Sequence, residues 1–193
     1  MGMKCTFLVA SMADPATRLK DLPQLDVAAS DTLATEILGK RTWGRSRRAH
    51  RSGDLASDVH LDVDEIAIGA FGDITIVAYQ GACEWIEGNP PAWGRALIAE
   101  HEIDVFALQS TVNMGAFAFW RDARLTRAYA GGDGEVFVDD GAVLPFEHEA
   151  APDDGDFGRV TELAMLDRLG YWYEGPRPPN AIDPATVPLL VYR

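Results

Sequence analysis

Residues 103–130 read IDVFALQSTVNMGAFAFWRDARLTRAYA, and this stretch decides the fold. Three apolar, aromatic-rich runs, 103–109, 114–120 and 124–130, are separated by short polar breaks. Runs of this length and composition, joined by short connections, predict three consecutive antiparallel strands.

The break at Asp122 and Ala123 has the length of a two-residue hairpin turn. Residues directly opposite each other in an antiparallel pair share a face, so this turn predicts the faces of both strands. One predicted face carries Ala116, Trp120, Leu125 and Tyr129, and the other carries Phe117, Phe119 and Ala128. Both faces are apolar, which predicts that helices or loops cover the sheet on both sides.

The same turn places Arg121 opposite Arg124. The two guanidinium groups either extend into water or hold an anion between them, and Asp122 can offset their repulsion. The sequence leaves both possibilities open.

The composition limits the classes of protein to which this chain can belong. The chain has 193 residues, of which 47% are hydrophobic, and this is enough for one domain, 1–193, with a sizeable core. A formal net charge of −13 argues against a general nucleic-acid binder, because such proteins bind phosphates through basic residues. The same charge would steer a basic protein partner toward the surface.

The chain shows no sign of a membrane or secretory location. No uninterrupted apolar run is long enough to cross a bilayer, and residues 1–10 lack the length of a signal peptide. We therefore expect a cytoplasmic protein. Its cysteines, Cys5 and Cys83, both lie in apolar surroundings, which predicts buried free thiols.

The rest of the chain alternates between helix and strand patterns. Asp14-Pro15 begins one helix, and further helices are predicted over 26–38, 91–100 and 160–169. Strands are predicted over 4–10, 65–71, 74–79, 135–138 and 187–192, with Gly72-Asp73 turning one hairpin. The short connections predict an α+β fold, with a single mostly antiparallel β-sheet of about six to seven strands and helices packed on it.

One segment, 40–51, is basic in an otherwise acidic chain. Arg45, Arg47 and Arg48 in this segment are candidate anion-binding residues, with Trp43 able to stack on a base. The alternative is a solvated loop whose arginines pair with acidic neighbours.

Residues 58–64 alternate strictly between polar and apolar side chains. As an extended strand, this segment would align His60, Asp62 and Asp64, groups that can ligate a divalent metal. The alternative is the wet face of an edge strand, kept charged against aggregation.

Several stretches together resemble an uncharacterised family of actinobacterial proteins. The resemblance is carried by Met1-Gly2-x-Lys4, Asp14-Pro15 with Leu25-Asp26, Gly69-Ala70-Phe71, Phe117-Ala118-x-Trp120, Gly141-x-x-Leu144-Pro145-Phe146-Glu147, and Ile182-Asp183-Pro184 with Val187-Pro188. It spans nearly the whole chain, although the basic segment 40–51 departs from the pattern. The resemblance implies a bacterial cytoplasmic origin and brings no substrate, cofactor or catalytic residue with it.

Motifs of common enzyme classes are missing from the sequence. There is no Gly-x-Ser-x-Gly elbow, phosphate-binding loop, Cys-x-x-Cys pair or His-Glu-x-x-His motif. We therefore expect a non-catalytic protein-binding domain without a cofactor, for example an inhibitor or immunity-like protein that masks a basic partner. The alternative is a small enzyme, or an anion- or nucleotide-binding protein, with its site between the sheet and the helices.

Overall fold

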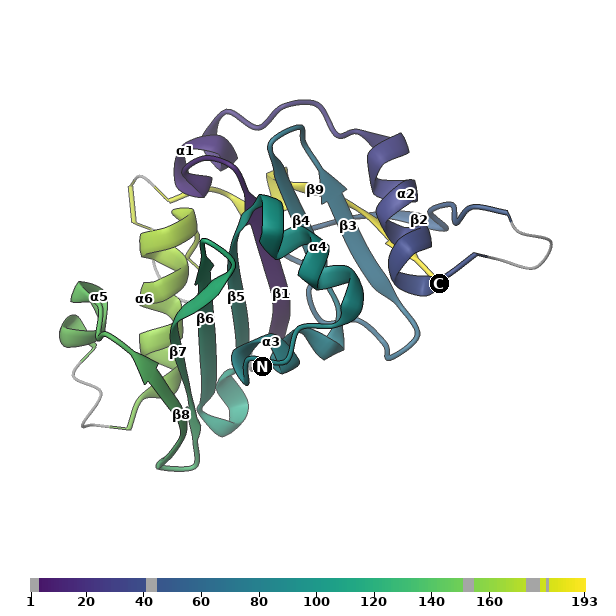
Figure 1. Ribbon diagram of the computed structural model, residues 1–193. Coiled ribbons are helices and arrows are strands. Elements are labelled where there is room, and N and C mark those ends of the chain that lie inside the picture. The colour runs from purple at the N-terminus through teal and green to yellow at the C-terminus, as the bar shows by residue number, and fades with distance from the viewer. Residues whose placement is uncertain (1–3, 41–44, 151–154, 173–177, 180) are drawn as a thin grey trace.

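A computed structural model of the chain describes residues 4–40, 45–150, 155–172, 178–179 and 181–193 (Figure 1). Within these residues, nine strands form one sheet in the order β2-β9-β3-β4-β1-β5-β6-β7-β8, and every neighbouring pair is antiparallel. The strands are β1 Lys4–Ser11, β2 Arg51–Asp54, β3 Ile66–Ala70, β4 Ile74–Ala78, β5 Glu102–Gln109, β6 Met114–Arg121, β7 Arg124–Gly132, β8 Glu135–Gly141 and β9 Pro188–Tyr192. The α-helices are α1 Pro15–Lys20, α2 Val27–Leu38, α3 Cys83–Ile86, α4 Ala92–Glu100, α5 Pro145–Glu149 and α6 Phe157–Leu169.

The α+β class and the single antiparallel sheet are confirmed, but the sheet has nine strands rather than six to seven. One strand that the sequence did not predict is β2, a four-residue polar segment at one edge. It has no alternation of apolar residues, and it becomes a strand because its backbone pairs with β9.

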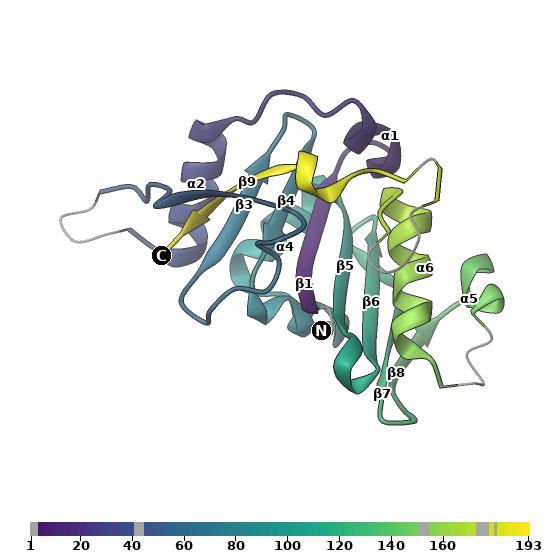
Figure 2. The ribbon, with the colours of Figure 1, turned by 180° about the vertical axis from the view of Figure 1, so that it is seen from behind.

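Helices cover both faces of the sheet (Figure 1 and Figure 2). The helices α2, α3 and α4 lie on one face, and α1, α5 and α6 lie on the other. Two hydrophobic cores result. The α4-side core contains Trp85 and Ile98, and the α6-side core contains Phe146 and Phe157. The sheet is the middle of three layers, as the two apolar faces of the central strands predict.

The hairpin between β6 and β7 turns at Asp122 and Ala123, as predicted. Both residues have positive φ angles, 50° and 58°, which is the backbone of a type I′ turn. Arg121 and Arg124 lie opposite each other at its base.

A β-bulge beyond the turn changes the pairing of β6 with β7. Phe119 lies opposite Arg127 rather than Thr126, and every later pair shifts by one residue. The predicted faces of Tyr129 and Ala128 are therefore wrong, because Tyr129 joins the α6-side core and Ala128 joins the α4-side core. The hydroxyl of the extra residue, Thr126, donates to Phe119 O at 2.9 Å, a contact that no alternation pattern encodes.

The second predicted hairpin is also confirmed. Gly72 and Asp73 join β3 to β4, and the Phe71 N–H donates to Ile74 O at 2.8 Å across the turn. Gly72 has a φ angle of 74°, a conformation that favours glycine.

Aspartate caps begin three of the six α-helices in the described part of the chain. The carboxylates of Asp14, Asp26 and Asp156 accept backbone N–H groups in the first turns of α1, α2 and α6. Gly170 ends α6 in the left-handed conformation, with φ of 64°. The first two starts agree with the prediction, whereas α6 begins three residues earlier than the predicted 160.

Residues 58–64 do not form the predicted strand and instead make a succession of turns and bends. Val59 and Leu61 are buried in the α6-side core, whereas Val63 is 85% exposed. The Thr6 N–H donates to Val59 O at 2.7 Å. The alternation in the sequence therefore comes from a loop that two apolar side chains hold against the core.

The two cysteines have different environments. Cys5 is buried in β1, as predicted, but Cys83 at the start of α3 is exposed, and both are free thiols. Burial raises the pKa of the Cys5 thiol to about 12, so this thiol stays protonated and unreactive at neutral pH.

Across the part of the chain that the structure describes, every helix is too short or too polar to span a membrane.

Candidate functional site

The structure uses Arg47 of the predicted anion site to close the end of α2. Its backbone N–H donates to Thr35 Oγ1 at 2.8 Å, and its guanidinium donates to Leu38 O at 3.0 Å and Gly39 O at 2.8 Å. A further guanidinium N–H donates to Arg193 O at 2.8 Å. These bonds satisfy carbonyl groups that the helix end leaves without partners.

The other two predicted arginines lie in different surroundings. Arg48 forms an ion pair with Asp31 of α2, a residue that is 5% exposed. Arg45 is exposed and forms no ion pair with a residue that the structure describes. Trp43, the predicted stacking residue, lies outside the described residues. Anion binding by this segment stays a prediction, and Arg45 is the one of the three arginines whose guanidinium has no ion-pair partner among the described residues.

The predicted metal ligands lie on the loop between β2 and β3. His60, Asp62 and Asp64 are all exposed there. Arg193 donates two hydrogen bonds to Asp64, at 2.7 and 3.0 Å, and these bonds lower the pKa of the Asp64 carboxyl. Among the described residues, no three or more His, Cys, Asp or Glu side chains are grouped so that they could hold a metal ion.

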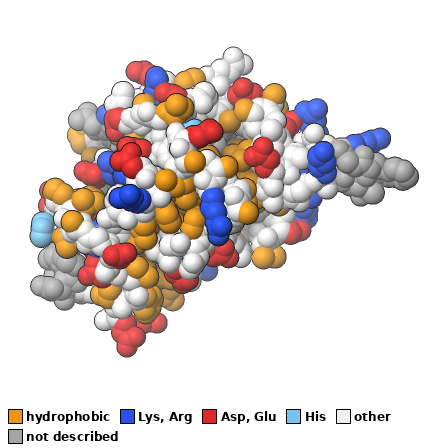
Figure 3. Space-filling model, in the orientation of Figure 1, with side chains coloured by type: hydrophobic (Ala, Val, Ile, Leu, Met, Phe, Trp, Pro, Cys, Tyr) orange, Lys and Arg blue, Asp and Glu red, His pale blue; other side chains and the backbone are white. Residues whose placement is uncertain are grey.

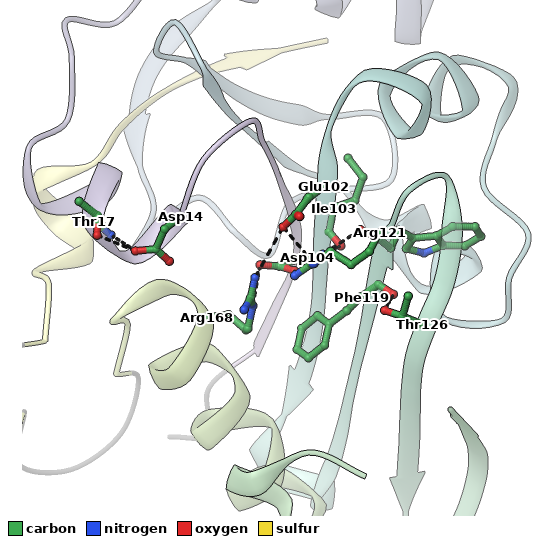
Figure 4. Close-up of polar contacts among 10 residues, drawn as sticks. Asp14, Thr17, Glu102, Ile103, Asp104, Phe119, Arg121, Thr126 and Arg168 are labelled. Atoms are coloured by element: carbon green, nitrogen blue, oxygen red, sulfur yellow. Dashed lines mark hydrogen bonds and ion pairs between the residues drawn. The ribbon is translucent and has the colours of Figure 1, made fainter. Parts of the chain in front are cut away.

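A cluster of charged side chains around the buried Asp104 lies where β5 begins (Figure 4). Asp104 of β5 is 1% exposed and lies between Arg121 of β6 and Arg168 of α6. Its carboxylate accepts from Arg121 Nη2 at 2.5 Å and from Arg168 Nε at 3.3 Å. The Glu102 carboxylate adds a contact of 3.0 Å to Arg121 Nε. Two cations and two carboxylates balance in this cluster, which ties α6 to the sheet.

A pocket of about 360 Å³ opens beside the Asp104 cluster, between the sheet and the helices α5 and α6. Phe119 forms part of its wall, and the guanidinium carbons of Arg121 and Arg168 each lie 5.6 Å from the centre of that ring. Because both arginines are already paired with carboxylates, little positive charge remains for an anionic ligand.

A second buried ion pair joins β7 to α5. Arg127 and Glu147 are each 2% exposed, and Arg127 Nε and Nη2 donate to the two Glu147 oxygens at 2.9 and 2.5 Å. Arg127 Nη1 donates to Asp139 Oδ1 of β8 at 2.5 Å. Burial alone would lower the pKa of Arg127, but the hydrogen bonds to Glu147 and Asp139 raise it. The charged guanidinium therefore anchors β8 to the fold.

The strand β8 lies at the edge of the sheet, and no described strand pairs with its outer side. None of its seven residues is buried, and Val136 and Phe137 are 54% and 60% exposed. Exposed acidic residues lie around this apolar pair: Asp133, Glu135, Asp139 and Asp140. We call these six residues the β8 edge. Figure 3 shows hydrophobic side chains beside carboxylates at the lower left of the molecule, over the β7–β8 hairpin.

The opposite edge of the sheet is built differently. The strand β2 has four residues, none of them a large apolar side chain. Arg51 forms an ion pair with Asp58, and the Asp58 carboxylate lies where a Cβ at Gly53 would be. A short, charged strand is a common way to protect a sheet edge from further pairing, whereas β8 is longer and exposes two large apolar side chains beside its carboxylates.

Sequence reasoning predicted a strand at 135–138 but did not identify it as a site. The available signal was the run Val136-Phe137-Val138, because three successive apolar residues in a strand cannot all face one core. That β8 is an edge depends on its place in the sheet, which the sequence pattern does not contain.

Comparison with known proteins places the chain in a family of unknown function. The sequence profile of a family of unknown function, DUF6928, matches residues 5–192. No curated protein and no solved structure gives a significant match. The family match thus covers nearly the whole chain, and its description specifies no ligand, partner or reaction.

Proposed function

We propose that this chain, which belongs to the DUF6928 family, is a non-catalytic protein that binds a basic, extended segment of a partner protein along the outer side of β8. The observation that carries the proposal is an edge strand whose outer side no described strand pairs with, and which has two exposed apolar side chains among carboxylates. A partner strand would complete the backbone hydrogen bonds of β8, and its basic side chains would meet the acidic ones.

The charge of the molecule supports a basic partner. The formal net charge is −13, and the β8 edge gathers four carboxylates, of which Asp139 is paired with Arg127. A second copy of the chain would bring like charges together at this edge, which is unfavourable. A basic segment would be attracted to it. An inhibitor or immunity-like protein that masks a basic partner in the bacterial cytoplasm is the form of this function that we favour.

Synthetic peptides test the proposal without a known partner. We expect a labelled peptide of alternating valine and lysine to bind the full chain in fluorescence anisotropy, and a valine–glutamate peptide not to bind. Binding should weaken as salt concentration rises, because charge attraction at an exposed surface is screened. Phe137→Asp should remove most of the binding, since it replaces the largest apolar contact of the edge.

Val63→Asp is the matched control, because Val63 is an exposed valine on the loop between β2 and β3. Circular dichroism should show that both variants keep the fold. Equal binding of the two peptides, or full binding of the valine–lysine peptide to Phe137→Asp, would show that the β8 edge is not the binding surface.

The second candidate function is a small enzyme or an anion-binding protein with its site between sheet and helices. The pocket of about 360 Å³ beside Arg121 and Arg168 favours it, because a cavity of this size holds a small ligand. Calorimetric titration with inorganic phosphate tests it. Binding that is lost in Arg168→Gln and kept in Arg124→Gln would favour this candidate, and absence of binding would leave the β8 edge as the better-supported site.

A further inference from the structure

A groove runs along α4 on the face of the sheet opposite α6. Two adjoining pockets, of about 420 and 430 Å³, form it, and they share Ile98 and Ala123. Both volumes lie in the range of small-molecule sites. The residues of the β8 edge do not line either pocket.

One end of the groove offers hydrogen-bond donors. Arg95 of α4 is exposed there and forms no ion pair with a described residue. Trp120 lines the same end, and its indole N–H is buried without an acceptor among the residues that the structure describes. No Asp or Glu lines this end. A carboxylate is the group that best fits a guanidinium that has no ion-pair partner among the described residues.

The other end of the groove carries the opposite charge. It is lined by Glu100, Glu102 and Asp122, together with His101. Glu102 is engaged by Arg121 at 3.0 Å, whereas Glu100 and Asp122 form no ion pair with a residue in the described part of the chain. An ammonium group of a ligand would supply the missing positive charge at this end.

The spacing of the two ends follows from the geometry of α4. Arg95 and Glu100 both belong to this helix. With a rise of about 1.5 Å per residue, their Cα atoms are separated by about 7.5 Å along the axis. The floor between them is apolar and includes Ile98 and Trp120.

We propose that this groove binds a small linear zwitterion, with its carboxylate at Arg95, its ammonium group at Glu100 and Asp122, and an unbranched apolar spacer over Ile98. The chemical class is that of ω-amino carboxylic acids and of short peptides with the same separation of charges. The proposal does not depend on the β8 edge.

Three probes with the same hydrocarbon chain test the proposal: ε-aminocaproate, caproate and hexylamine. Two-dimensional NMR of the Trp120 indole N–H, assigned with Trp120→Phe, reports binding in the full chain. We expect ε-aminocaproate to shift this resonance saturably and to bind about tenfold more tightly than either single-charge probe, because each of those lacks one charge-assisted contact.

Charge-removing variants identify which end holds which group. Arg95→Gln should weaken ε-aminocaproate about tenfold and leave hexylamine unchanged. Asp122→Asn, which tolerates the left-handed turn backbone, should weaken ε-aminocaproate and leave caproate unchanged. Lys20→Gln and Glu36→Gln, which remove exposed charges elsewhere, are the matched controls.

Three results would overturn the proposal: equal binding of the three probes, no shift of the Trp120 resonance, or full affinity in Arg95→Gln. Phe137→Asp should leave ε-aminocaproate binding intact. This last variant separates a failure of the groove from a failure of the β8 edge.

Discussion

The strands β6 and β8 belong to the same sheet and are separated only by β7, yet they differ in nearly every contact. Six of the eight residues of β6 are buried, whereas none of the seven residues of β8 is. β6 has α6 on one face and α3 on the other, while β7 is the one described strand that pairs with β8. Within one sheet, the role of a strand is therefore set by what covers it: a covered strand carries stability, and a bare edge is available for binding.

Two glycines explain how α6 covers the central strands so closely. A Cβ at Gly115 of β6 would lie 2.0 Å from Phe157 O of α6, and a Cβ at Gly131 of β7 would lie 2.0 Å from Cε1 of the Phe157 ring. The start of α6 thus occupies the space that side chains would fill. None of the seven residues of β8 is buried in this way.

The largest effect is expected at the ion pair that fixes β7 and β8 to α5. Glu147→Ala leaves Arg127 buried without its two-oxygen partner, so the free energy of unfolding should fall by about 3–5 kcal/mol. Glu149→Ala, at an exposed position of the same helix, is the control. Urea unfolding followed by circular dichroism measures both variants, and equal midpoints would contradict a structural role for the pair.

A smaller loss is expected where α6 meets the sheet. Gly131→Ala places a methyl group against the Phe157 ring, so overpacking should lower the free energy of unfolding by about 1–3 kcal/mol. Gly132→Ala is the matched control, because a Cβ there would lie 3.4 Å from the flexible Met114 side chain. The same unfolding assay applies, and a neutral Gly131→Ala would mean that α6 can move away from the strands.

A third change weakens α1, which packs against α6. Asp14 accepts hydrogen bonds from the Thr17 hydroxyl at 2.6 Å and the Thr17 N–H at 3.0 Å. Asp14→Ala removes this cap and should cost about 1 kcal/mol. The side-chain hydrogen bond from Thr17 is the main cause of the lowered pKa of the Asp14 carboxyl.

This cap should give a defined pH dependence. A carboxyl whose pKa is lower in the folded state stabilises the fold above its unfolded pKa of about 3.9, and that contribution is lost as the pH falls through the lowered folded pKa. The difference in unfolding free energy between the unchanged chain and Asp14→Ala should therefore be largest near neutral pH and shrink in acid. If this difference in unfolding free energy increased as the pH fell, the result would contradict the predicted role of the Asp14 carboxylate.

The smallest effect on stability is expected at β8. Phe137→Ala removes an aromatic ring that is 60% exposed, so the free energy of unfolding should change by less than about 0.5 kcal/mol. The same substitution at Phe117 of β6, which is fully buried, should cost about 3–5 kcal/mol. Thermal unfolding of the two variants tests the contrast directly, and similar losses would mean that β8 contributes to the core after all.

Much of the local structure was predictable. The turn at Asp122 and Ala123, the hairpin at Gly72 and the helix cap at Asp14 all agree with the sequence pattern. Each of these features depends on residues within a few positions of one another, so the residues that identify the turn or cap in the sequence are also the residues that form it.

The candidate sites were harder to predict. Arg47 and Arg48 look like free cations in a basic run, but α2 carbonyls and Asp31 engage them. Residues 58–64 alternate like a strand, but the core takes up Val59 and Leu61 from a loop. In both cases the structure of the segment depends on contacts with residues distant in the sequence, and the local sequence pattern does not indicate these contacts.

The sequence by itself determined most of the longer helices and strands and their order, because turn chemistry, capping and hydrophobic runs act over a few residues. Only the tertiary structure decided that β2 pairs with β9 and that β8 remains an edge. It also decided that a bulge forms at Thr126, which places Ala128 and Tyr129 on the opposite faces of the sheet from those predicted. These outcomes depend on which distant segments lie side by side, and burial, charge pairing and open backbone groups are all defined by those neighbours.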